Sequence, residues 1–347
     1  MKKRKKIVLI ILILSFLLLC AVILFWKPLR SVFSVKKLED GLYQMSYRGD
    51  YGLDDFLSQG GASSDMEAAD FVVQNAFHGL FKLNPQSRPY GCSTLSVESA
   101  QGDQLFGRNF DWGNCTALVL ETAPRNGYAS VSTVNMDFLN VGLPLSEEAF
   151  VRLLSVAAPY APMDGMNEKG LCVAVLMIED RPGFDQQSEK NDLTTTTAVR
   201  LLLDKAATVE EAVELLEDYD LHASAGMMVH FAIADAQGRN VVVEYVDNTL
   251  SIVESPIATN FYLTPGEKYG VGTQESMTRY QMLSGLIEEQ GAWDLDAVRD
   301  ALNSVSKHNF NSPFASTEWS VVYDQTNGEL RYYHREDYSH FYPFFVR

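Results

Sequence analysis

The predicted strands of this sequence come in neighbouring pairs joined by short turns, and this arrangement limits the possible folds more than any other feature. One pair is Cys92–Glu98 and Gln104–Asn109, with turn residues around Gly102 between them. Residues 227–246 and residues 318–334 each read as two strands with a turn between them, and the latter range contains the turn signal Asn-Gly. Strands joined by such short turns pair antiparallel.

Helical patterns lie between these strand groups instead of alternating with single strands. Three amphipathic stretches begin with Ser or Thr, at residues 146–157, 194–206 and 208–219, and two more cover residues 275–290 and 295–306. We therefore expect an α+β fold of antiparallel sheets covered by helices. The sequence contains no phosphate-binding loop and no dinucleotide fingerprint, and we expect no cofactor.

The chain begins with a basic segment, Met1–Lys6, followed by the uncharged and almost wholly apolar run Ile7–Trp26. This run is long enough to cross about 30 Å of hydrocarbon as a helix. The basic residues in front of it place the N-terminus in the cytoplasm and the rest of the chain outside. We therefore predict that residues 1–26 form a basic stub and a transmembrane signal anchor in the cell membrane. A cleaved signal peptide, which would give a secreted protein, and a lipoprotein signal ending at Cys20 stay open as alternatives.

Behind this segment the chain is long enough for one large domain. Residues 27–91 contain one helical pattern, within Ser64–Phe81, and read as a lead-in or pro-segment, whereas residues 92–347 hold the paired strands. The formal charge is -17 although the N-terminus is basic, so the exterior part is strongly acidic. Such a surface repels nucleic acid, and we expect no nucleic-acid partner. The oligomeric state stays open.

The first predicted hairpin brings a thiol close to two charged side chains. Cys92 begins one strand, and Arg108 and Asp111 follow on the return strand. A thiol is a strong nucleophile only as thiolate, so it needs a neighbouring base or a lowered pKa. No histidine lies near Cys92 in the sequence, and the six histidines lack the spacing of metal ligands, so we expect no metal. Taken alone, a cysteine in an apolar strand is usually a packed core residue.

Another base becomes available if the peptide bond between Gly91 and Cys92 is broken. Cys92 then carries a free α-amine with a pKa near 8, so the nucleophile supplies its own base. This is the chemistry of N-terminal nucleophile hydrolases.

Several motifs from Cys92 to the C-terminus resemble the choloylglycine hydrolase and linear amide hydrolase family, which uses this chemistry. They are GCSTL at Cys92, GRNFDW with Arg108 and Asp111, DGMNEKGL at Asp164–Leu171, ATNFYL with Asn260, SMTRY with Arg279, and TEWSVVYD near the C-terminus. The resemblance implies a four-layer αββα sandwich and hydrolysis of a linear amide bond of an N-acylated small molecule. It also implies that Cys92 is the nucleophile and that Gly91–Cys92 is a self-cleavage site.

The resemblance also implies roles for the other residues. Asp111 would hold the α-amine, and Arg108 would orient Asp111 and lower the pKa of the thiol. Asn260 would donate a hydrogen bond to the oxyanion, together with the backbone N–H of Met177, and Arg279 would be a second active-site arginine.

Two departures from the family pattern bear on the substrate and on maturation. Met177 stands where the bile salt hydrolases have asparagine and the penicillin V acylases have tyrosine, so neither substrate class is assigned. In addition, 91 residues precede Cys92, which is typical of the family's pro-enzymes. An acyltransferase that uses the same thioester and an inactive membrane-anchored binding protein stay open as alternatives.

Two further cysteines lie outside these motifs, in a compartment that permits disulfides. Cys115 follows the strand with Arg108, and Cys172 begins a strand that the resemblance places in the same sandwich. A disulfide between them and two buried free thiols are equally compatible with the sequence.

Overall fold

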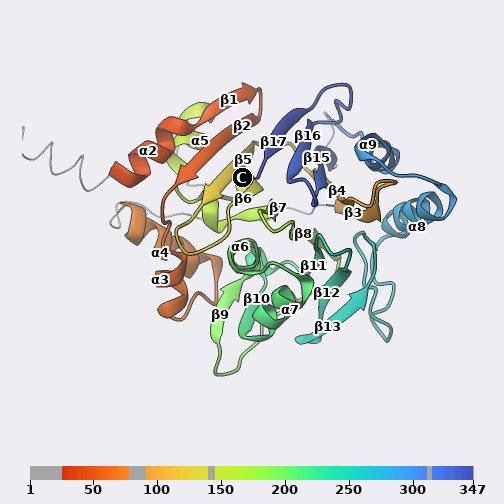
Figure 1. Ribbon diagram of the computed structural model, residues 1–347. Helices are drawn as coiled ribbons and strands as arrows, with labels where there is room; N and C mark the ends of the chain where they lie inside the picture. Colours follow the sequence, from red (N-terminus) through yellow and green to blue (C-terminus); the bar gives the residue numbers. More distant parts are fainter. Residues whose placement is uncertain (1–25, 78–90, 140–144, 311–314, 347) are drawn as a thin grey trace, which may run out of the picture.

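The computed structural model describes residues 26–77, 91–139, 145–310 and 315–346 (Figure 1). They form two large sheets that face each other, with helices on the outer face of each sheet. The expected four-layer arrangement of helices and sheets is therefore present.

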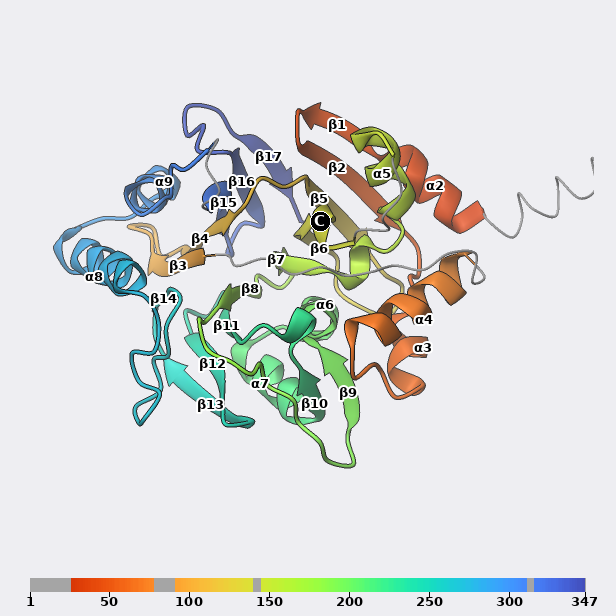
Figure 2. The same cartoon turned by 180° about the vertical axis from the view of Figure 1, so that it is seen from behind.

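The larger sheet has nine strands. Their order is β1 (Lys36–Glu39), β2 (Leu42–Arg48), β5 (Ala117–Ala123), β6 (Ser130–Asn135), β7 (Pro162–Asn167), β8 (Cys172–Met177), β11 (Val229–Ala234), β12 (Asn240–Val246) and β13 (Thr249–Glu254). Two helices, α6 (Thr195–Lys205) and α7 (Val209–Glu217), cover it from β7 to β12. Seen from behind, β1 and β13 lie at opposite ends of the molecule (Figure 2).

The smaller sheet has six strands and carries the predicted hairpin. Their order is β14 (Ile257–Ala258), β3 (Gly91–Glu98), β4 (Gln104–Trp112), β15 (Ser316–Asp324), β16 (Glu329–His334) and β17 (Tyr342–Phe345). Two helices, α8 (Gln274–Glu289) and α9 (Leu295–Ser304), pack on its outer face against β3, β4 and β15. All neighbouring pairs in this sheet are antiparallel, as expected.

The remaining elements belong neither to the two large sheets nor to the four helices named above. They are α2 (Trp26–Ser34), α3 (Leu53–Ser58), α4 (Asp65–Phe77), α5 (Glu147–Leu154), the parallel pair β9 (Asn191–Thr194) and β10 (Tyr219–His222), and single 3₁₀ turns at Met136–Leu139, Ala158–Tyr160 and Ser224–Gly226.

Side-chain caps explain where several predicted helices begin. Thr194 and Thr208 precede α6 and α7, and each accepts a hydrogen bond from a backbone N–H in the first turn. Ser146 does the same for α5, and Asp294 for α9. These side chains satisfy N–H groups that have no partner within the helix.

The prediction of a lead-in with a single helix is wrong for residues 27–91. Besides α4, the segment forms α2, α3 and the hairpin β1–β2, whose turn at Asp40-Gly41 is a readable turn signal. Strand β2 pairs parallel with β5, from Leu42 opposite Ala117 to Arg48 opposite Ala123, so the larger sheet is not wholly antiparallel. Strand β2 thus covers the edge of β5, which would otherwise be left unpaired.

A buried hydrogen-bond network ties the same segment to α6 and to the 3₁₀ turn at Tyr160. The Tyr51 hydroxyl donates to the carboxylate of Asp204, which forms an ion pair with Arg200 at 2.8 Å. The hydroxyl of Tyr160 donates to the backbone carbonyl of Tyr51 at 3.0 Å. All four side chains are buried.

The predicted membrane anchor lies almost wholly outside the described residues, which begin at Trp26. Within the described part of the chain, no helix has both the length and the apolar character needed to cross a membrane.

The possible disulfide is not formed, because Cys115 and Cys172 are free buried thiols. Cys115 lies just before β5 and Cys172 begins β8, and β6 and β7 separate these strands in the sheet. Three strand spacings amount to about 14 Å, well beyond the reach of a disulfide.

We predict that Tyr51→Phe lowers the free energy of unfolding by about 1–3 kcal/mol, because the buried Asp204 carboxylate loses a hydrogen-bond donor. Urea unfolding followed by tryptophan fluorescence measures the change. Tyr269→Phe is the matched control, since Tyr269 is 62% exposed. Equal unfolding midpoints for the two variants would contradict a stabilising role of the hydrogen bond from Tyr51 to Asp204.

Candidate active site

Cys92 is the second residue of β3 and is completely buried. In the hairpin it lies opposite Phe110, while Gly91 lies opposite Asp111 and Thr94 opposite Arg108. The predicted hairpin is therefore confirmed. Residues that lie opposite each other point to the same face of a sheet, so Cys92 and Arg108 share one face and Gly91 and Asp111 share the other.

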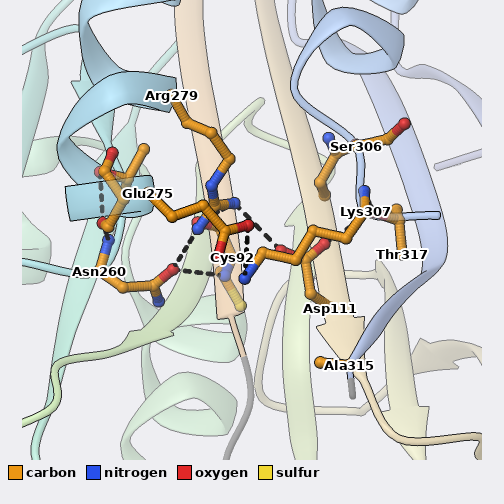
Figure 3. Close-up of polar contacts among 12 residues, drawn as sticks. Cys92, Asp111, Asn260, Glu275, Arg279, Ser306, Lys307, Ala315 and Thr317 are labelled. Atoms are coloured by element: carbon orange, nitrogen blue, oxygen red, sulfur yellow. Dashed lines mark hydrogen bonds and ion pairs between the residues drawn. The ribbon is translucent and has the colours of Figure 1, made fainter. Parts of the chain in front are cut away.

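Arg279 of α8 joins three parts of the site. Its Nη1 donates to the backbone carbonyl of Cys92 at 3.1 Å and to Asp111 Oδ2 at 3.0 Å, and its Nη2 donates to Asn260 Oδ1 at 2.7 Å. The hydroxyl of Thr317 donates to the other oxygen of Asp111 at 2.7 Å. Arg279 and Thr317 therefore orient Asp111 (Figure 3).

The prediction that Arg108 orients Asp111 is wrong. The two residues are three positions apart on β4, so their side chains leave opposite faces of the strand. Arg108 Nε instead donates to Asp164 on β7, and its Nη2 donates to the carbonyl of Val175 at 3.0 Å. Both Arg108 and Asp164 are fully buried between the two sheets.

Arg108 acts on the thiol, as predicted, but burial acts more strongly. Burial raises the pKa of the Cys92 thiol, whereas the positive charge and hydrogen bond of Arg108 lower it, and the pKa remains above its usual value. In the unbroken chain the thiol is therefore protonated at neutral pH and needs a base.

Asn260 lies next to the nucleophile and has two fixed hydrogen-bonding groups. Its Oδ1 accepts a hydrogen bond from the backbone N–H of Cys92 at 2.8 Å. Its Nδ2 donates to the backbone carbonyl of Met177 at 2.7 Å. Met177 therefore lies at the site, and it contacts Asn260 through the backbone carbonyl of Met177 and not through the Met177 N–H.

A fully buried ion pair supports the loop that carries Asn260. His230 Nδ1 contacts Glu244 at 3.1 Å, and its Nε2 contacts the carbonyl of Thr259 at 2.7 Å. Glu244 also accepts hydrogen bonds from the backbone N–H groups of Leu263 and Thr264, both at 2.8 Å. Each ring nitrogen of His230 thus faces an oxygen atom, one on the Glu244 side chain and one on the Thr259 backbone.

Gly91 occupies a tight position beside the nucleophile. A Cβ atom there would lie 2.9 Å from Asp111 Oδ2 and 2.9 Å from Lys307 Nζ. The Asp111 carboxylate is held on both oxygens, so it cannot move aside at low cost. Glycine at this position therefore allows the chain to pass between the two charged groups.

Several residues of the site were not predicted from the sequence. Asp164 begins the quoted DGMNEKGL motif, so its position could have been found there. Thr317 likewise begins the quoted TEWSVVYD motif, whereas Lys307 lies in the loop after α9, where no local pattern marks it. Their roles depend on which strands become neighbours.

A metal site is not evident in the described ranges. Within residues 26–77, 91–139, 145–310 and 315–346, no group of His, Cys, Asp and Glu side chains is arranged to hold a metal ion.

Comparison with known proteins identifies the same family that the sequence motifs resemble. A family model described as linear amide C–N hydrolases, choloylglycine hydrolase family, matches residues 92–283. The bile salt hydrolase/transferase of Clostridium perfringens is 26% identical over 175 residues, which are 48% of this chain and 51% of that protein. The match therefore spans about half the length of this curated relative.

Solved structures share the fold at low sequence identity. A cysteine-to-alanine mutant of the conjugated bile acid hydrolase from Clostridium perfringens superposes with a TM-score of 0.54 and 18% identity, over 73% of this chain and 92% of that one. An arginine-to-leucine variant of the same enzyme gives a TM-score of 0.55 and 17% identity over the same shares. The sandwich of the two sheets is thus shared with these hydrolases.

We predict that Glu244→Gln lowers kcat by about tenfold or more, because the loop that positions Asn260 loses its buried anion. Its unfolding free energy should fall by about 1–3 kcal/mol, since the buried N–H groups that Glu244 accepts from lose a charged acceptor. Steady-state kinetics and urea unfolding measure the two effects. Glu254→Gln, which removes an exposed partner of Arg239, is the matched control.

The pH dependence of stability gives an independent check on Glu244. Burial raises the pKa of Glu244. Interactions with His230, through a hydrogen bond and its charge, and hydrogen bonds from Thr264 and Leu263 lower the pKa by more, so it lies below its usual value. The carboxylate therefore stabilises the fold above its unfolded pKa of about 4.3, and this contribution is lost as the pH falls through the folded value. In acid, the variant should lose stability less steeply than the wild type, and equal slopes would contradict this role.

Proposed function

Because the chain belongs to the choloylglycine hydrolase family of linear amide C–N hydrolases, we propose that it is a cysteine amidase. Its substrate is an N-acylated small molecule, and the reaction passes through a thioester on Cys92. The observation that carries the proposal is the set of contacts that joins Cys92, Asp111 and Asn260 through Arg279.

The proposed enzyme first cleaves its own chain between Gly91 and Cys92. The Cys92 sulfur attacks the carbonyl carbon of Gly91, a C–S bond forms, the C–N bond breaks, and the thiol proton moves to the Cys92 nitrogen. Water then hydrolyses the thioester and leaves Gly91 as a carboxylate and Cys92 with a free thiol and α-amine. The narrow space for Gly91 and the raised pKa of the buried thiol support the need for this step.

The new α-amine serves as the base in amide hydrolysis. It takes the thiol proton, the sulfur attacks the substrate carbonyl, and the ammonium returns a proton to the leaving amine. Asn260 Oδ1 already contacts the Cys92 nitrogen, and Asp111 lies beside Gly91, so both hold the amine in place. Water, activated by the same amine, then releases the acid from the thioester.

Asn260 also stabilises the oxyanion in this proposal. Its Nδ2 carries two hydrogens, and the recorded contact with Met177 uses one of them. The second hydrogen is available for the developing negative charge. A donor of this kind contributes about 3 kcal/mol to lowering the barrier.

Acyl transfer to an amine is the second candidate reaction, because the relative from Clostridium perfringens is named a hydrolase/transferase. The same thioester on Cys92 would then react with an amine in place of water. Adding a free amine to the assay separates the two reactions by their products.

We also propose that Ile7–Trp26 anchors the enzyme in the cell membrane with the catalytic domain outside, since its apolar length and the basic residues before it fit a signal anchor. We predict that the N-terminal fragment stays in the membrane pellet after alkaline carbonate extraction. Release of a chain that begins after the apolar run would favour a cleaved signal peptide instead.

We predict that the active wild-type protein consists of two chains, with the second beginning at Cys92. Intact-mass measurement of the purified protein tests this directly. The Cys92→Ala variant should stay in one chain and hydrolyse no amide, because it lacks the nucleophile for both steps. The Asn260→Ala variant should fold but hydrolyse amides about two to three orders of magnitude more slowly.

An unbroken chain with full amidase activity would rule out the α-amine mechanism. Wild-type activity in folded Cys92→Ala protein would rule out the assignment of the nucleophile. An intact wild-type chain without activity would favour a binding protein that keeps the fold.

A further inference from the structure

Lys307 is a cation beside the scissile bond that the proposed chemistry does not use. It lies in the loop after α9, and its backbone is held by two hydrogen bonds with Thr317, both 2.8 Å long. The side chain is 16% exposed and reaches toward Cys92 from the side of the site opposite α8 (Figure 3). Its Nζ lies 2.9 Å from the position that a Cβ on Gly91 would take.

The pairing of Lys307 differs from that of the two arginines in the site. Arg108 and Arg279 bind the buried carboxylates of Asp164 and Asp111, so both are committed within the protein. Lys307 pairs with Glu275 at 3.2 Å, and the Glu275 side chain is 59% exposed. Because the Glu275 partner is exposed, solvent weakens the pair, and another anion can take the place of Glu275.

Self-cleavage would free the space next to this lysine. Gly91 leaves the gap between Lys307 and Asp111, and the new α-amine of Cys92 faces the same gap. Because this amine must deliver a proton to the leaving nitrogen of the substrate, the leaving amine has to lie beside it. The leaving amine therefore comes within reach of Lys307.

We propose that Lys307 selects amides whose leaving amine carries a carboxylate, that is, N-acyl amino acids. The substrate carboxylate replaces Glu275 as the partner of Lys307. In an N-acyl amino acid the carboxylate carbon is two bonds from the amide nitrogen, which places it on the lysine side of the site. This inference rests on the proposed function and names its substrate class.

A matched pair of substrates tests the proposal on the mature, full-length protein. N-acylglycine and N-acylethanolamine with the same acyl chain differ in the carboxylate alone. Lys307→Met should raise KM for the N-acylglycine by about tenfold, the size expected of one charged hydrogen bond, and change KM for the ethanolamide less than twofold. Lys307→Arg should retain most of the preference for N-acylglycine over N-acylethanolamine. Glu275→Gln should lower KM for the N-acylglycine, because Lys307 then has no competing carboxylate.

The control for a general charge effect is Lys36→Met, on the outer strand β1. It should change neither KM value. If Lys307→Met changes both KM values equally, or neither, the proposed selection is wrong.

A second measurement does not depend on amide hydrolysis. Iodoacetate and iodoacetamide alkylate the same thiol but differ in charge, and mass spectrometry of the Cys92 peptide gives both rates. Lys307→Met should lower the ratio of the iodoacetate rate to the iodoacetamide rate several-fold. An unchanged ratio overturns the role of Lys307 alone, whereas failure of Cys92 to react with either reagent overturns the proposed function and this inference with it.

Discussion

The buried ion pair between Arg108 and Asp164 is the interaction on which the rest of the structure depends. It joins β4 of the smaller sheet to β7 of the larger sheet, and both side chains are fully buried. Asp164 also accepts hydrogen bonds from Trp319 and Tyr323 of β15, so one carboxylate ties three strands together. Removing one partner of such a pair leaves an uncompensated charge in the core, which costs about 3–5 kcal/mol.

Charged side chains lie on both faces of the strand that carries the nucleophile. On the inner face, the positive charge of Arg108 lies beside the Cys92 thiol and opposes the effect of burial on its pKa. On the outer face, Arg279 and Asp111 hold the backbone of the same residue and the position of Gly91. The side chain and the backbone of Cys92 thus lie beside different charged groups, on opposite faces of the same strand.

The N-terminal segment belongs to the fold and is not an appendage to it. Strand β2 continues the larger sheet through its pairing with β5, and Tyr51 reaches the buried Asp204. If the chain is cut before Cys92, these contacts hold the two parts together without a covalent link.

The hairpin that places Cys92 opposite the strand with Arg108 and Asp111 was predictable from the sequence, because a short turn between alternating strands determines the local register. The helix starts at Thr194 and Thr208 were predictable for a similar reason, since a cap acts within one turn. Only the tertiary structure decided that Asp164 is the partner of Arg108, and that β1 and β2 join the larger sheet. Those choices depend on contacts between residues far apart in the chain, and a local pattern carries no information about which distant strand or carboxylate becomes the neighbour.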